Sequence, residues 1–195
     1  IAGIILCTLR HFSEKQSIKT VELAQMFSKD GVVGFDIAAD EAGFSLDNHI
    51  SSFNYAINNN INCTAHAGEA KGAGSIWETI KKLKSKRIGH GVRCTEDKEL
   101  VKYLKENDYH LEICVSSNIK TKTFNKIEDH PISDIFNSSI SLSINTDGRT
   151  ISDTSLTNEY EIISNNYNWS IKDFKVCNLQ AIKPVSYTHL TLPTS

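Results

Sequence analysis

A histidine and a glutamate stand three residues apart in the stretch CTAHAGEA, residues 63–70. The β-prone run Asn62–Ala67 ends just after His66, and Gly68 allows a tight turn that brings Glu69 to the same strand end. An imidazole and a carboxylate in one place can bind a divalent metal or transfer protons. A lone strand histidine is more often bonded to a core carbonyl, so a functional interpretation needs partners elsewhere in the chain.

Other polar residues follow other β-prone runs. His90 lies between Gly89 and Gly91, where little side-chain bulk favours close approach of a ligand, and Asp147 follows the run SLSIN. Further polar residues close two more runs: Asp36, Asp40, Glu41, Ser116, Ser117 and Asn118. The runs themselves are largely apolar, so the sequence sorts its chemistry to the C-terminal ends of the expected strands.

The expected strands alternate with segments of helical period. The strands are predicted at Ala2–Cys7, Val32–Ala38, Asn62–Ala67, Arg87–Gly91, His110–Val115 and Ser141–Asn145. Apolar residues at helical spacing predict helices around residues 50–57, 76–83, 100–104 and 132–136, and a capping box at Ser170–Asp173 predicts a last one. This alternation is typical of a parallel α/β fold.

Two parallel architectures compete, an open doubly wound sheet and a (β/α)8 barrel. An open sheet would favour a glycine-rich phosphate turn, but the only candidate, EAKGAGS at residues 69–75, has neither GxGxxG nor a GK[ST] ending. Barrel enzymes place their polar residues at the C-terminal ends of several strands. The sequence therefore favours a barrel.

Composition narrows the class of protein. The 195 residues suit one domain, and a net charge of −2 argues against a nucleic-acid partner. No apolar run approaches the roughly 18 residues that span a bilayer. The five cysteines are scattered and never spaced as CxxC, which predicts reduced thiols, a cytoplasmic location and no cysteine zinc site. Nothing in the sequence predicts the oligomeric state.

Together the terminal residues predict metal-assisted hydrolysis. His66 and Asp147 suit zinc, although two ligands do not complete a site with three protein ligands; Asp147 could also be a plain helix cap. Glu69 could be a carboxylate at a helix N-terminus or a general acid, and His90 with Asp147 would steer an attacking water. The chain has no GxSxG motif and no HxE…PCxxC motif.

The motifs TAHAGEA, RIGHGVR, LEICVSSN and SINTD, in this order, resemble the adenosine deaminase family, especially its bacterial members. GIILCTLRH and VVGFDIAADEAGF extend the resemblance upstream, so that it covers residues 1–182. The resemblance implies a zinc-dependent (β/α)8 barrel that converts adenosine or deoxyadenosine to inosine or deoxyinosine plus ammonia in purine salvage. It makes His66 a zinc ligand, Glu69 the proton donor to the purine, His90 the residue that orients or deprotonates the water, and Asp147 the last zinc ligand.

The chain departs from the family pattern in several places. The family's other two zinc ligands form an H-x-H that this chain lacks, and the first strand resembles the third of the barrel, which implies a partial barrel of strands three to eight. We therefore expect the 195-residue chain alone to bind zinc weakly and to be almost inactive, and the intact parent to be active. At two substrate-binding positions the chain has Ala39 in AADE, for AGDE, and Gly148 in TDGR, for TDDP; Arg149 could compensate for the latter.

These departures leave alternatives open. One is an adenine or other purine deaminase of the same superfamily; another is an inactive binding or signalling homologue, against which the retention of the four central residues speaks. After a barrel part at 1–182, the segment 183–195 holds two of the three prolines and no acidic residue, and is predicted to be a non-native or read-through tail.

Overall fold

The structure is a computed structural model and describes residues 2–182. One sheet pairs β1 (Ile4–Leu9) with β2 (Val32–Ala38). The other has the order β3 (Thr64–Ala67), β4 (Arg87–His90), β5 (His110–Ile113) and β6 (Ser141–Ile144). All paired strands are parallel, and among the described residues one isolated bridge, Phe35 to Cys63, joins β2 to the chain entering β3. The six predicted strands are thus present, with ends shifted by a few residues.

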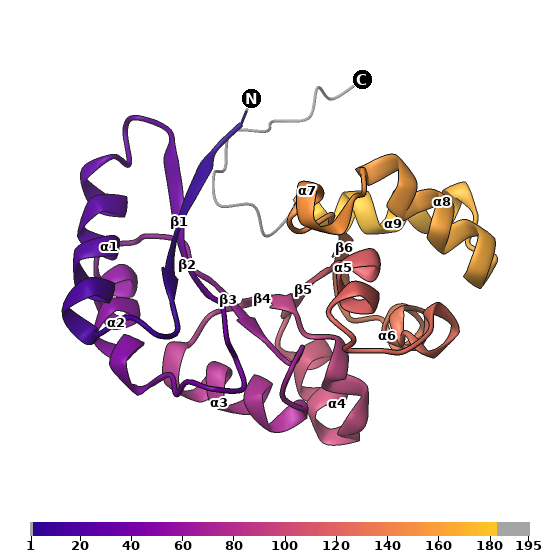
Figure 1. Cartoon of the computed structure of the whole chain (residues 1–195), viewed down its shortest axis with the longest axis horizontal. Coiled ribbons are helices and arrows are strands. Elements are labelled where there is room, and N and C mark those ends of the chain that lie inside the picture. The colour runs from indigo at the N-terminus through magenta and orange to yellow at the C-terminus, as the bar shows by residue number, and fades with distance from the viewer. Residues whose placement is uncertain (1, 183–195) are drawn as a thin grey trace.

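The strands follow one another in chain order and lie along an arc, with α1 to α4 on its convex side (Figure 1). An open doubly wound sheet would reverse its strand order at a switch point, and no reversal occurs in residues 2–182. The predicted partial (β/α)8 barrel is therefore confirmed. Because every strand runs the same way, all C-terminal ends meet at one rim of the arc.

Helices connect the strands. The α-helices are α1 (Glu14–Met26), α2 (Ile50–Asn58), α3 (Ala73–Leu83), α4 (Lys98–Glu106), α5 (Val115–Lys120), α6 (Ile132–Asn137), α7 (Arg149–Ser152), α8 (Leu156–Tyr167) and α9 (Ile171–Ile182). Short 3₁₀ turns are η1 (Asp47–His49), η2 (Val92–Glu96) and η3 (Ile127–Asp129). The five predicted helices correspond to α2, α3, α4, α6 and α9. The sequence did not predict α1, α5, α7 or α8. In α1 the apolar residues are sparse, although Ser13 and Gln16 form a capping box at its start.

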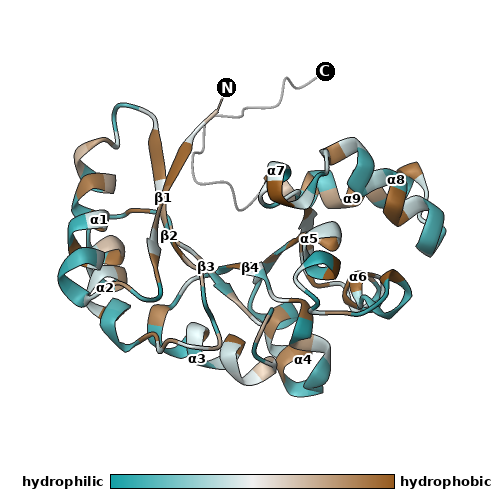
Figure 2. Ribbon diagram, viewed as in Figure 1, coloured by the Kyte–Doolittle hydropathy of each residue, from teal (hydrophilic) through white to brown (hydrophobic). Residues whose placement is uncertain are grey.

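The core lies between the sheet and the helices. Ile88, Leu111 and Leu142 of successive strands are fully buried and belong to one cluster with Leu100 and Leu104 of α4. A second cluster, built around Phe35, Phe53 and Leu83, fills the space between β2, α2 and α3. Apolar residues concentrate along the strands, while the outer surfaces of the helices are largely hydrophilic (Figure 2).

Two further sequence predictions concern membrane-spanning segments and the last thirteen residues. No helix within residues 2–182 is long and apolar enough to cross a membrane. The predicted tail, 183–195, lies outside the described residues, so the division of the chain after Ile182 stays a prediction.

Candidate active site

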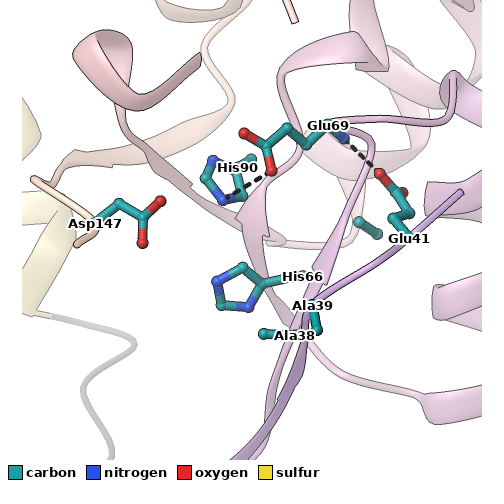
Figure 3. A pocket seen from close by; sticks show the side chains of 8 residues that line it. Ala38, Ala39, Glu41, His66, Glu69, His90 and Asp147 are labelled. Atoms are coloured by element: carbon teal, nitrogen blue, oxygen red, sulfur yellow. Dashed lines mark hydrogen bonds and ion pairs between the residues drawn. The ribbon is translucent and has the colours of Figure 1, made fainter. Parts of the chain in front are cut away.

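A cavity of about 290 Å³ opens at the C-terminal rim of the strands (Figure 3). Its lining consists of Ala38, Ala39, Glu41, His66, Ala67, Glu69, His90 and Asp147. The four residues predicted to do chemistry, His66, Glu69, His90 and Asp147, therefore share one cavity although they follow three different strands. The structure brings together what the sequence had scattered over about eighty positions.

His66 is held from behind by a carboxylate. Its Nδ1 lies 3.1 and 3.2 Å from the two carboxylate oxygens of Asp36 on β2. Burial acts to lower the pKa of His66, but Asp36 outweighs it and raises that pKa to about 9. Because Asp36 occupies Nδ1, the ring nitrogen left over for other partners is Nε2.

Glu69 and His90 form a second pair. Oε2 of Glu69 lies 3.5 Å from Nε2 of His90, and Oε1 accepts hydrogen bonds from Asn118 Nδ2 at 2.9 Å and Thr121 Oγ1 at 3.0 Å. His90 is almost wholly buried, and this burial lowers its pKa despite the neighbouring carboxylate of Glu69. The pair is thus anchored on its protein side and faces the cavity on the other.

The loop that carries Glu69 is wrapped around the buried carboxylate of Glu41. Oε1 of Glu41 accepts the amide N–H of Gly68 at 2.6 Å, and Oε2 accepts the amides of Glu69, Ala70 and Lys71 at 3.1, 2.6 and 3.0 Å. The Ser75 hydroxyl adds a fifth donor. Burial acts to raise the pKa of Glu41, but these donors lower it overall. Glu41 therefore fixes the backbone from which Glu69 projects.

Two glycines make this packing possible. Gly68 has a φ of +70°, and a Cβ there would lie 2.4 Å from Cδ1 of Ile76, so only glycine fits at the turn. A Cβ on Gly89 would lie 2.9 Å from the ring of His66. The space beside His90 that the sequence suggested for a ligand is therefore taken, at Gly89, by the imidazole of His66.

Asp147 follows β6 and accepts a hydrogen bond from the Ser117 hydroxyl at 2.7 Å through Oδ2. Its φ is +54°, and φ is also positive at Ala39 (+78°) and His90 (+61°). Residues other than glycine rarely adopt such angles, and they gather at functional sites where the surrounding structure enforces them. Three strand ends at this cavity share that strain.

The two positions predicted to contact substrate differ in placement. Ala39 lines the cavity, and its positive φ explains why a glycine would suit that position. Gly148 precedes α7 beside Asp147 with an ordinary φ of −66°. A Cβ there would meet only Ile151 at 3.7 Å, an ordinary contact, so the structure leaves room for a side chain at Gly148.

The donors at the cavity suit zinc in kind, since His66 offers a nitrogen and Asp147 a carboxylate oxygen. In number they fall short: no group of three metal-binding side chains occurs within residues 2–182. His66 and Asp147 could therefore form part of a zinc site, which at least one further ligand would have to complete.

Three polar residues bond to the predicted site residues in ways that the sequence did not predict: Ser117 and Asn118 were expected at a strand end without a role, and Thr121 was not expected there. Ser117 and Asn118 lie in α5 directly after β5, and Thr121 follows that helix. The available signal was their position, because the polar SSN of LEICVSSN comes immediately after a strand. Glu41 carried a similar signal after β2, yet its role as an acceptor for four amides is visible only in three dimensions.

Comparison with known proteins identifies the family. The model of a protein family described as Adenosine deaminase matches residues 2–189. The chain belongs to the adenosine deaminase family. An adenosine deaminase from Clostridium acetobutylicum is 37% identical over 174 residues, covering 89% of this chain and 52% of that protein. The chain thus spans about half the length of the curated relatives it matches.

Solved structures in this family's fold extend the likeness. The N6-mAMP deaminase of Arabidopsis superimposes with a TM-score of 0.87 at 28% identity, covering 96% of this chain and 55% of that one. An amidohydrolase from Burkholderia ambifaria, solved with bound Zn, gives a TM-score of 0.88 at 19% identity, covering 96% and 53%. The latter shows the shared fold alone.

Proposed function

We propose that a full-length protein carrying this sequence catalyses the zinc-dependent hydrolytic deamination of adenosine or deoxyadenosine. The observation that carries the proposal is the convergence of His66, Glu69, His90 and Asp147 on one cavity. Membership of the adenosine deaminase family supports a hydrolytic deaminase, and the nitrogen and carboxylate donors of His66 and Asp147 at one cavity support the metal. The product would be inosine or deoxyinosine, as in purine salvage, and a cytoplasmic location stays a prediction from the five unpaired thiols.

Each residue has a defined task in the proposed reaction. His66 and Asp147 would hold zinc together with at least one further ligand, and the metal would supply acidification of the attacking water near neutral pH. His90 orients that water toward the purine carbon that bears the amine. Glu69, anchored through Oε1, donates a proton to the adjacent ring nitrogen from its other oxygen. The amine then leaves as ammonia, and the water oxygen remains on the purine.

The second candidate is a deaminase of adenine or of another purine. Ala39 adds a methyl group to the cavity lining at a position where the family usually has glycine. Gly148 stands beside Asp147 at a position where the family usually has a second aspartate, so that carboxylate is missing here. Because an N6-mAMP deaminase is among the similar structures, a modified purine nucleotide is a further candidate substrate. An inactive homologue is the third candidate, but the geometry of the site speaks against decay.

The test is a substrate comparison with the full-length, zinc-loaded protein. Loss of absorbance at the purine band is followed for adenosine, deoxyadenosine, adenine and N6-methyl-AMP. We expect the highest kcat/KM for a nucleoside. Preference for adenine or N6-methyl-AMP supports the second candidate, and no turnover of any of the four contradicts the proposal.

The 195-residue chain should behave differently from the full-length protein. Because residues 2–182 contain no group of three metal-binding side chains, we expect the chain alone to bind zinc weakly and to have little activity. Equilibrium dialysis against zinc checks the first expectation. Robust inosine production by the chain alone would contradict the second.

A further inference from the structure

A buried histidine lies behind the site without lining its cavity. His130, between η3 and α6, is 3% exposed, and Nε2 of its ring lies 3.2 Å from Oδ1 of Asn118, which is fully buried. Asn118 in turn contacts both Glu69 and His90. His130 is therefore linked to the proposed proton donor through one side chain.

The hydrogen on the His130 ring can be assigned from its partners. The amide N–H of Ile132 donates to Nδ1 at 3.2 Å, so Nδ1 carries no hydrogen and Nε2 carries it. Burial and the nearby His90 lower the pKa of His130 to about 3, which keeps the ring neutral near neutral pH. His130 therefore donates from Nε2 to the Asn118 carbonyl oxygen.

That donation fixes the orientation of the Asn118 amide. With Oδ1 facing His130, the two N–H groups of Nδ2 donate to Oε1 of Glu69 at 2.9 Å and to Nδ1 of His90 at 3.2 Å. A flipped amide would place its oxygen against the carboxylate of Glu69 and its N–H groups against the N–H of His130. Both ends of the amide thus favour one orientation.

The orientation of Asn118 determines where hydrogens sit in the proposed active site. Oε1 of Glu69 accepts from Asn118 and lies 3.0 Å from the Thr121 hydroxyl, so in the neutral acid the proton belongs on Oε2. Nδ1 of His90 accepts from Asn118, so its neutral ring carries hydrogen on Nε2, 3.5 Å from that same Oε2. Asn118 thus determines the hydrogen positions on both Oε2 of Glu69 and Nε2 of His90.

We propose that Asn118 and His130 are positioning residues that set which oxygen of Glu69 carries its proton and which ring nitrogen of His90 carries its hydrogen. The proposal deepens the function proposed above and depends on it for its catalytic consequence. The hydrogen-bond arrangement itself does not depend on the substrate. The two are therefore testable separately.

The kinetic test uses the full-length, zinc-loaded protein and the variants His130→Leu and His130→Gln. Leucine removes the donor to Asn118, whereas glutamine can present an N–H near the place of Nε2. We expect His130→Leu to lower kcat roughly 10- to 100-fold per bound zinc with little change in KM, as is usual for residues that orient active groups. His130→Gln should recover most of that loss.

The control is His110→Leu. His110 starts β5 and is also 3% exposed, but its ring nitrogens contact Ser141 and Ser143 of β6, and it does not line the candidate active-site cavity. This variant should lower the thermal midpoint and leave kcat per bound zinc unchanged. An equal loss of kcat in both leucine variants, or no recovery by glutamine, would overturn the proposal.

A spectroscopic readout separates this proposal from the proposed function. ¹⁵N-histidine NMR of the full-length protein should show Nδ1 of His90 without hydrogen, and His130→Leu should change that signal. If no purine is deaminated but the signal behaves this way, the function fails and the positioning role stands. If Nδ1 of His90 carries hydrogen, or the signal is unaffected by His130→Leu, the positioning role is refuted.

Discussion

The two ends of the parallel strands use polar residues in opposite ways. At the N-terminal ends, Arg87 and Thr64 both bond to the carboxylate of Glu112, Thr64 at 2.9 Å, and both ring nitrogens of His110 contact serine hydroxyls. At the C-terminal rim, His66 is bonded at one nitrogen and lines a cavity with the rest of its ring. Burial and charge alone therefore do not mark a reactive group; the difference is that both ring nitrogens of His110 are bonded to serines, whereas His66 uses one nitrogen for Asp36 and presents the other side of its ring to the cavity.

The backbone repeats this contrast. Positive φ angles occur at Asn60, Lys84, Asp108 and Ser139, each of which follows a helix and precedes a strand, as is common where helices end. At the rim the same angles occur at Ala39, His90 and Asp147, which line the cavity. One conformation ends helices at one side of the sheet and aims side chains at the other.

The largest expected effect concerns the rim. Glu69→Gln keeps the size of the side chain but removes the acidic proton that the proposed reaction transfers. The kcat of the full-length protein should therefore fall roughly 10²- to 10⁴-fold while bound zinc stays unchanged. Steady-state kinetics and metal analysis check both. Glu96→Gln, a change in an exposed pair with Arg93, is the matched control and should be silent. Zinc lost together with activity would make Glu69 a ligand and contradict its role as acid.

Glu41→Gln should have the largest effect on stability. An amide cannot replace a carboxylate that accepts four backbone N–H groups, and each buried donor left unsatisfied costs about 1–3 kcal/mol. We expect the free energy of unfolding of the full-length protein to fall by about 3 kcal/mol, measured in denaturant. A loss of stability no larger than that of Glu96→Gln would show that the loop of residues 68–71 does not depend on Glu41 for its stability.

The stabilising effect of Glu41 should also depend on pH. Its pKa is lower in the folded protein than in the unfolded chain, whose value is about 4.3. The contribution is therefore present above pH 4.3 and is lost as the pH falls through the folded value. Glu41→Gln should flatten this acid limb of the stability curve.

The two buried histidines, one at each end of the comparison, should titrate alike. Burial lowers the pKa of His110 to about 4 and that of His130 to about 3, against about 6.5 when unfolded. As the pH falls below 6.5 the unfolded chain takes up protons that the folded one refuses, so stability declines by about 2 kcal/mol per histidine between pH 7 and 5. Replacing either histidine by leucine should remove its share of this pH dependence, whereas only His130→Leu should lower kcat.

The smallest effects concern the strained backbone. Ala39→Gly and Lys84→Gly each place glycine at a positive φ, and each should raise the free energy of unfolding by up to about 1 kcal/mol. Denaturant midpoints check this. Ala39→Gly should also change KM because Ala39 lines the cavity, and Lys84→Gly should not. A change in KM for both would mean that the contrast between the two ends is wrong.

Periodicity and spacing in the sequence predicted the strands and the place of the candidate site, but not all of the helices or the hydrogen bonds behind the site. The β-rich runs with polar residues after them predicted the order of the strands and the rim where His66, Glu69, His90 and Asp147 meet. The helix Glu14–Met26 escaped because its apolar residues are few, and tertiary packing rather than pattern defines it. Asn118 was expected at a strand end, but its link to His130 was not predicted, because a hydrogen-bond chain depends on side-chain directions that spacing does not encode.

The junction between β2 and β3 joins the two sheets and also holds residues of the candidate site in place. Within the described residues, only the bridge from Phe35 to Cys63 links the two sheets through strand pairing. Asp36 on His66, Glu41 on the loop after β3, and Arg10 donating to the His66 carbonyl at 2.8 Å span the same seam. The contacts that hold His66 and the loop of Glu69 in place are thus the same contacts that join the two sheets, so a substitution at Asp36, Glu41 or Arg10 should change both the candidate site and the stability of the junction.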